Sequence, residues 1–176
     1  MNTTRSAIDH LVNNNDRYAA GFGEQDLGGE PARRVAVVTC MDARIDVFAA
    51  LGLANGEAHI IRNSGGVVTD DVIRSLCLSQ RLLGTREIML IHHTDCGLQG
   101  VDEVEFRHGL EAELGVKPSW SVEAFDNPYD DIRQSIQRVY MSPFLPHKET
   151  VRGFVYSVAD GHLREVSLDG STQIAD

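Results

Sequence analysis

The stretch "REIMLIHHTDCG", Arg86 to Gly97, contains an apolar run that ends in two histidines, with a cysteine three residues after the second. The apolar run has the length and composition of a buried β-strand. A second stretch, "VVTCMDAR" from Val37 to Arg44, has the same layout: an apolar run, then a cysteine, then charged residues. Both stretches therefore place metal-binding side chains directly after a predicted buried strand.

Strand and helix patterns alternate around these two stretches. Apolar runs predict strands at residues 33–40, 56–63 and 86–93. Helical spacing of apolar residues predicts helices at residues 45–53, 67–84 and 127–143. Residues 150–168 predict two strands joined by a turn at Asp160 and Gly161. The pattern predicts an α/β fold, with a mainly parallel central β-sheet flanked by helices and an antiparallel edge strand at the C-terminus.

The N-terminal thirty residues differ from the rest of the chain. Residues 3–18 have the pattern of a helix, and the Gly-rich connection "GFGEQDLGGEP" follows. A length of 176 residues suits one domain with a substantial core. We therefore expect residues 1–30 to form a helical arm with its connection, and residues 31–176 to form a single metal-binding α/β domain.

Net charge, apolar runs and cysteine content indicate which partners and which cellular location to expect for this chain. The net charge is −10 at pH 7, which argues against nucleic acid and anionic membranes as partners. No apolar run approaches the roughly 20 residues of a membrane span, and the N-terminus lacks the apolar segment of a signal peptide. A cytoplasmic location is expected, where the three cysteines stay reduced. Cys77, in the middle of a predicted helix, is expected to be a buried apolar-face residue.

Cys40, His93 and Cys96 are the candidate metal ligands. In an α/β sheet, ligands bind beyond the carboxyl ends of the strands, where the strand order reverses. If the strands that end at Cys40 and His93 are neighbours, the three side chains converge there. Two thiolates and one imidazole favour zinc, and three protein ligands leave the fourth position open, as in a catalytic site. His92 should face away, because neighbouring residues of a strand point to opposite sides.

Each of these residues alone has a simpler interpretation. A lone cysteine at a strand end is most often a small buried hydrophobe, and a lone H-x-x-C is a weak signal. The two motifs together, each at the end of an apolar strand, favour the metal site. Nothing in the sequence ties the other histidines to it, and they are expected on the surface or near the site: His10, His59, His108, His147 and His162.

Asp42 and Arg44 follow Cys40 at two and four residues. A carboxylate so close to a zinc ligand can take the open coordination position, or it can accept a hydrogen bond from a zinc-bound water. Arg44 can hold the carboxylate in the second role by a bidentate pair. The alternative to such a functional pair is an ordinary surface ion pair between Asp42 and Arg44, which would contribute little to the stability of the fold.

The segment "IIRNSGGVVTDD" contains two adjacent glycines between a strand and a helix. It matches neither nucleotide-binding glycine motif, so it predicts a tight packing turn beside the metal site. Arg62 in this segment is a candidate contact for an anion or a partner chain.

With these motifs in place, the chain resembles the β-class carbonic anhydrases of the compact archaeal and bacterial branch. The resemblance rests on C-x-D-x-R at residues 40–44, R-N-x-G at residues 62–65 and H-x-x-C-G at residues 93–97. Two positions depart from the pattern. Ala43 stands where many relatives have Ser, and little effect is expected; Gly66 follows the R-N-x-G element and is expected to alter the lining of the cleft.

The resemblance implies a lyase that hydrates CO2 reversibly to bicarbonate and a proton, by attack of zinc-bound hydroxide on CO2. It implies one zinc per chain with Cys40, His93 and Cys96 as ligands. It makes Asp42 and Arg44 the catalytic dyad, with Asp42 as a fourth zinc ligand in a closed form. It also implies a homodimer or tetramer with the active-site cleft at a subunit interface.

Three other functions remain open from the sequence. COS and CS2 are also linear and apolar, so the motifs do not separate their hydrolysis from CO2 hydration. A non-catalytic zinc-binding regulatory protein is a second alternative, although it has no need for Asp42 and Arg44. A thiol redox protein is the third, and the sequence lacks the C-x-x-C that such proteins use.

Overall fold

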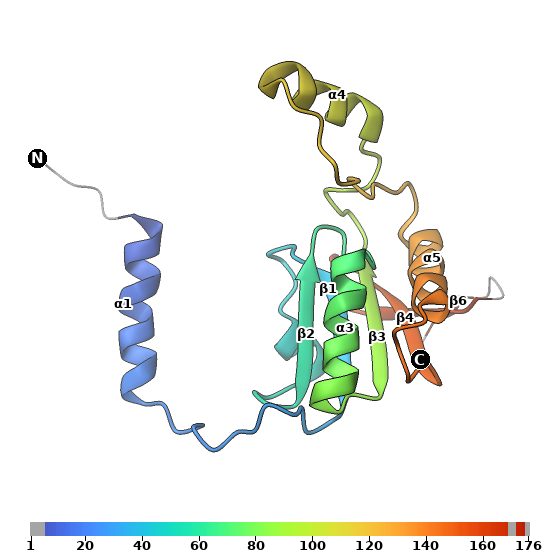
Figure 1. The fold of residues 1–176 in the computed structure, drawn as a ribbon. Coiled ribbons are helices and arrows are strands. Elements are labelled where there is room, and N and C mark those ends of the chain that lie inside the picture. The colour runs from blue at the N-terminus through green and yellow to red at the C-terminus, as the bar shows by residue number, and fades with distance from the viewer. Residues whose placement is uncertain (1–5, 169–171, 175–176) are drawn as a thin grey trace, which may run out of the picture.

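A computed structural model of the chain describes residues 6–168 and 172–174, which form a six-stranded sheet with helices on both faces (Figure 1). The strand order is β2-β1-β3-β4-β5-β6. The strands are β1 Val35–Cys40, β2 Ala58–Asn63, β3 Glu87–His93, β4 Thr150–Tyr156, β5 Leu163–Val166 and β6 Thr172–Ile174. Strands β1 to β4 run parallel, while β5 and β6 are antiparallel to their neighbours. The predicted fold class is confirmed, and β6, which the sequence did not predict, forms the edge beyond β5.

Strand β1 lies between β2 and β3. The strand that follows β1 in the chain, β2, therefore lies on one side of it, and the next strand, β3, lies on the other side. Cys40, the last residue of β1, pairs with Asn63 at the end of β2, and Thr39 pairs with Ile91 near the end of β3. The carboxyl ends of all three strands meet where the strand order reverses, which is the usual binding position in such sheets.

Helices α3 (Asp70–Leu83) and α5 (Pro128–Met141) cover one face of the sheet. Helix α3 begins after the N-cap Thr69 and ends at the left-handed Gly84, and α5 starts with proline at its first position. Their inward side chains and alternate residues of β1 and β3 form one core, which includes Val38, Leu76, Leu90, Ile132 and Val139. The opposite face carries a second apolar cluster, with the short helix α2 (Val47–Leu51) at its margin.

Helices α1 (Ala7–Ala20) and α4 (Glu103–Leu114) stand away from the sheet (Figure 1), and neither has a buried residue. Helix α1 begins after its capping box of Ser6 and Asp9 and ends two residues beyond the predicted helix, and positions 3–5 of that prediction lie outside the described residues. It exposes apolar side chains, among them Ile8, Leu11 and Val12. A 14-residue helix with no buried residue is marginally stable in water on its own.

Cys77 is half-buried at the edge of the core between α3 and the sheet, whereas full burial was predicted. The reason is its position on the helix: Val72 and Leu76 point directly at the sheet, and Cys77 is turned by about 100° from Leu76.

No helix in the described part of the chain combines the length and hydropathy that crossing a membrane requires.

Candidate metal centre

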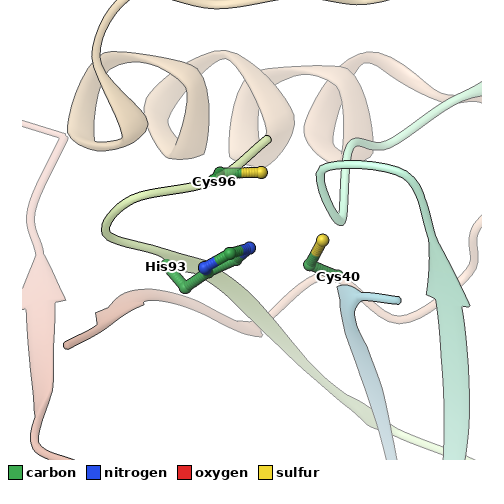
Figure 2. Close-up of side chains that lie close together, drawn as sticks. All are labelled: Cys40, His93 and Cys96. Carbon is green, nitrogen blue, oxygen red and sulfur yellow. The ribbon is translucent and has the colours of Figure 1, made fainter. Parts of the chain in front are cut away.

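Cys40, His93 and Cys96 converge at the carboxyl ends of β1 and β3. Cys40 and His93 are the last residues of their strands, and Cys96 lies in the following loop. One ligand atom from each residue lies within 4.8 Å of the others, and all three residues are buried. Figure 2 shows the three side chains directed toward a common point. The structure thus brings together the residues that the two motifs predicted, although more than fifty positions separate the first from the second.

The imidazole of His93 is held in the tautomer that a metal ligand needs. Its Nδ1 lies 2.9 Å from the carbonyl oxygen of Thr94. Because a carbonyl only accepts, Nδ1 carries the proton and Nε2 has a free lone pair. Nε2 is buried and has no hydrogen-bond partner among the described residues. A buried, unpaired nitrogen aimed at two thiols is the arrangement that a bound cation completes.

The two thiols influence each other's ionisation. A hydrogen bond from Cys96 lowers the pKa of Cys40, and the neighbouring His93 adds to that effect. The same contact with Cys40, together with burial, raises the pKa of Cys96. Burial disfavours the charged form of His93, but Cys40, the carbonyl of Thr94 and Asp42 together outweigh it and raise the pKa of the imidazole. A divalent cation removes this conflict by stabilising both thiolates, and two sulfurs with one nitrogen suit zinc.

Asp42 lies beside the three residues with its carboxylate turned to Arg44. Nε of Arg44 donates to Oδ1 of Asp42 at 3.0 Å, and Nη2 donates to Oδ2 at 2.8 Å. The backbone N–H of Arg44 also donates to Oδ1, at 2.9 Å. These bonds hold the pKa of Asp42 well below its usual range. The carboxylate is therefore ionised at neutral pH, and its Oδ2 lies 3.8 Å from Nε2 of His93.

Two arginines connect the loops around the centre. Arg62, at the end of β2, donates from Nε to the carbonyl of Cys40 at 2.9 Å and from Nη2 to that of Asp42 at 2.7 Å. Arg44 donates across the site to the Asp95 carboxylate. From its sequence position, Arg62 is a candidate contact for an anion or a partner chain, and Asp95 has no predicted role. Both contacts join residues distant in sequence, and only the sheet order could have indicated them.

The glycine pair packs its turn against the ligand-bearing strands. Gly65 and Gly66 have φ of +77° and +74°, which favour glycine. A Cβ at Gly66 would lie 2.8 Å from the backbone nitrogen of Cys40 and 3.0 Å from the carbonyl oxygen of Ile91. The predicted packing turn is confirmed. The expected effect of Gly66 on the cleft lining stays a prediction, while the structure shows that this glycine lies against the backbone of β1 and β3.

His92 faces the opposite side of the sheet, as strand alternation predicted. Its Nε2 lies 2.5 Å from Oδ2 of Asp131 on α5, and its ring stacks on Phe125 with centroids 5.6 Å apart. Among the described residues, one group of at least three His, Cys, Asp or Glu side chains could hold a metal ion. It consists of Cys40, His93 and Cys96. His59 and His147 are engaged elsewhere, with Ser79 and Arg86 respectively.

Comparison with known proteins gives matches along nearly the whole chain. A family model described as carbonic anhydrase matches residues 35–120. The chain is 51% identical over 159 residues to the β-carbonic anhydrase 1 of Mycobacterium tuberculosis, across 90% of this chain and 96% of that protein. It is 36% identical over 183 residues to a carbon disulfide hydrolase of Saccharolobus solfataricus, across 90% of each. A crystal structure of a Streptococcus mutans carbonic anhydrase matches with a TM-score of 0.87 and 42% identity, across 94% of this chain and 100% of that chain.

Proposed function

The chain belongs to the β-carbonic anhydrases, and from that premise we propose that it catalyses the reversible hydration of CO2 to bicarbonate and a proton. The observation that carries the proposal is the buried group of Cys40, His93 and Cys96 with an ionised Asp42 beside it. An enzyme of this family is a lyase, a carbonate dehydratase. Its small, linear substrate needs access to one metal coordination position and little other recognition.

Zinc is the cofactor of this family, and the residues present fit it. Cys40, His93 and Cys96 are the proposed ligands of one zinc ion per chain, for the reasons of charge and tautomer given above. A bound zinc ion lowers the pKa of a coordinated water to about 7, which makes a hydroxide nucleophile available near neutral pH. Three protein ligands leave room for that water.

Asp42 and Arg44 are the proposed catalytic dyad. Because Asp42 is ionised, its carboxylate can only accept hydrogen bonds, so it can take one from the reacting water and orient the oxygen lone pair toward CO2. Arg44 holds both carboxylate oxygens and so keeps Asp42 in this position. When that hold is lost, the same carboxylate is close enough to compete for the fourth metal position, which would close the site.

Hydrolysis of CS2 or COS is the second candidate, and the 36% identity to a carbon disulfide hydrolase favours it over the non-catalytic alternatives. Stopped-flow CO2 hydration and CS2 hydrolysis, measured on one zinc-quantified sample, separate the two. We expect CO2 hydration to be much the faster. CS2 hydrolysis without CO2 hydration would reverse the assignment, and neither activity at one zinc per chain would indicate a zinc-binding protein without catalysis.

The assembly and location belong to the same proposal. Residues 1–30 act as an arm that docks on a second copy of the chain, and residues 31–176 act as the zinc-binding domain. The exposed apolar side chains of α1, which no described part of the chain covers, support a homodimer or tetramer. Nucleic acid and membranes are not proposed partners, since the chain carries a net charge of −10. The cytoplasmic location stays a prediction.

A further inference from the structure

Asp95 makes a contact that the proposed function leaves unexplained. It lies in the loop between His93 and Cys96, and its side chain is 79% exposed. Its Oδ2 accepts a hydrogen bond from Nη1 of Arg44 at 2.7 Å, and its carbonyl oxygen accepts one from Nη2 at 2.8 Å. A single guanidinium therefore joins the carboxylate of Asp42 to the loop between two proposed metal ligands, His93 and Cys96.

We propose that Asp95 is a positioning residue, which fixes the Arg44 guanidinium so that Arg44 can hold the Asp42 carboxylate away from the metal. The inference rests on the proposed function. It concerns how the proposed dyad is oriented, and it assigns Asp95 no contact with the substrate.

The distribution of contacts around Arg44 supports this role. The hydrogen bonds from Nε, Nη2 and the backbone N–H to Asp42 all lie within one short turn, two residues apart. Arg44 makes its other described hydrogen bonds, to acceptors outside this turn, with Asp95 alone. The Arg44 side chain is 48% exposed, so little packing restrains it. Because the guanidinium is planar, its two hydrogen bonds to Asp95 fix the plane of the whole group. They therefore also fix the direction in which it meets Asp42.

The hydrogen bond should matter more than the charge of Asp95. An exposed ion pair is screened by water and contributes little. A hydrogen bond with fixed direction still sets the orientation of the guanidinium plane. A neutral acceptor of the same shape should therefore preserve most of the effect, while removal of the side chain, which leaves Arg44 only the backbone carbonyl of residue 95, should weaken it.

The backbone at Asp95 permits a clean test of that distinction. Its φ is +55°, a left-handed conformation that asparagine and glycine adopt more readily than most residues. Asp95→Asn removes the charge and keeps an acceptor, and Asp95→Gly removes the whole side chain. Neither substitution strains the loop between His93 and Cys96, so the two variants differ from wild type mainly in what they offer to Arg44.

The experiment uses the full chain with Co2+ in place of zinc, which makes the metal visible by absorption. Thiocyanate is titrated against wild type, Asp95→Asn and Asp95→Gly, because this anion competes for the same fourth position as Asp42. We expect thiocyanate to bind Asp95→Gly about ten-fold more weakly than wild type, the loss of roughly one net hydrogen bond. The spectrum of this variant should shift in the same direction as that of Arg44→Ala. Asp95→Asn should bind within about two-fold of wild type.

Two results would overturn the inference. One is equal thiocyanate affinity for wild type and Asp95→Gly at equal metal content. The other is a loss in Asp95→Asn as large as in Asp95→Gly, since that would assign the effect to charge. Failure of the proposed function is a separate outcome, recognised when metal-loaded wild type binds thiocyanate but does not hydrate CO2.

Discussion

The chemistry at the centre depends on which atoms each side chain leaves free. The carbonyl oxygen of Thr94 accepts a hydrogen bond from His93 Nδ1 and so leaves Nε2 free for a metal, while Arg44 donates hydrogen bonds to both carboxylate oxygens of Asp42. The sequence could predict the proposed ligands because each lies at, or just past, the end of an apolar strand. It could not predict the Arg44–Asp95 bond, because that contact spans 51 positions and depends on β1 and β3 being neighbours.

Cys96→Ser should largely abolish zinc binding. A serine hydroxyl is a poor zinc ligand, since it stays protonated where a thiol becomes a thiolate. Elemental analysis of purified protein should give close to one zinc per chain for wild type and far less for the variant. Cys77→Ser is the matched control, because Cys77 lies on α3 outside the metal group and should keep its zinc. Full zinc retention by Cys96→Ser would exclude the proposed ligand set.

Arg44→Ala should depress CO2 hydration most strongly near neutral pH. Arg44 holds the pKa of Asp42 far below its usual range, so Asp42 stays ionised and its own titration does not produce the pH dependence. Without Arg44, the free carboxylate competes for the fourth metal position and loses to hydroxide as the pH rises. The ratio of mutant to wild-type rate should therefore increase between about pH 6.5 and 8.5.

Arg74→Ala is the control for this change. It removes another exposed arginine and its carboxylate pair, with Asp71, and should leave the pH profile unchanged. If Arg44→Ala keeps wild-type activity over the whole range with Asp42 off the metal, then the pair is an ordinary ion pair and the dyad has no role.

Gly66→Ala should destabilise the protein and weaken metal binding together. The added methyl group would approach the backbone of Cys40 to 2.8 Å, and φ at this position is +74°. We expect the free energy of unfolding to fall by more than about 2 kcal/mol in urea denaturation. In Gly97→Ala the added Cβ has no neighbour within 4 Å, so a change within about 0.5 kcal/mol is expected. Equal stability of the two variants would show that the close approach is not required.

At the scale of elements, cap residues and apolar spacing were enough to predict α3 and α5. Helix α3 ends at Gly84 as predicted but begins after the N-cap Thr69, three residues later than predicted, and α5 begins at Pro128 within its predicted range. Strand β6 has three residues, too few for a periodic pattern, and its place depends on β5 offering a free edge. Helix α1 begins at Ala7 because Ser6 and Asp9 form a capping box, which is a strong signal for a helix start.

Strand β3 and helix α5 are joined by the buried His92–Asp131 pair. Asp131→Ala would leave the buried His92 ring without its carboxylate partner, so the free energy of unfolding should fall by about 1–3 kcal/mol. Urea denaturation provides the measurement. Asp130→Ala is the matched control, since Asp130 lies in the same first turn but is exposed and pairs only with Arg133 among the described ion pairs. A loss as large in the control would assign the effect to the helix terminus rather than to His92.

For the whole molecule, the unpacked arm is the feature that one chain alone does not explain. We expect light scattering at micromolar concentration to give at least twice the chain mass of 19.4 kDa. Deletion of residues 1–30 should shift the mass toward that of a single chain, because it removes the exposed apolar face of α1. A full-length mass near 19.4 kDa would contradict both the assembly and the role of the arm.

The most direct test of the account is the rate of CO2 hydration as a function of bound zinc. Metal-free wild-type protein is loaded stepwise, and each sample is divided between stopped-flow assay and elemental analysis. The account predicts a rate that rises in proportion to zinc and levels off at one ion per chain, with Cys96→Ser staying near the uncatalysed rate. A rate that does not follow zinc content, or no hydration at one zinc per chain, would contradict it.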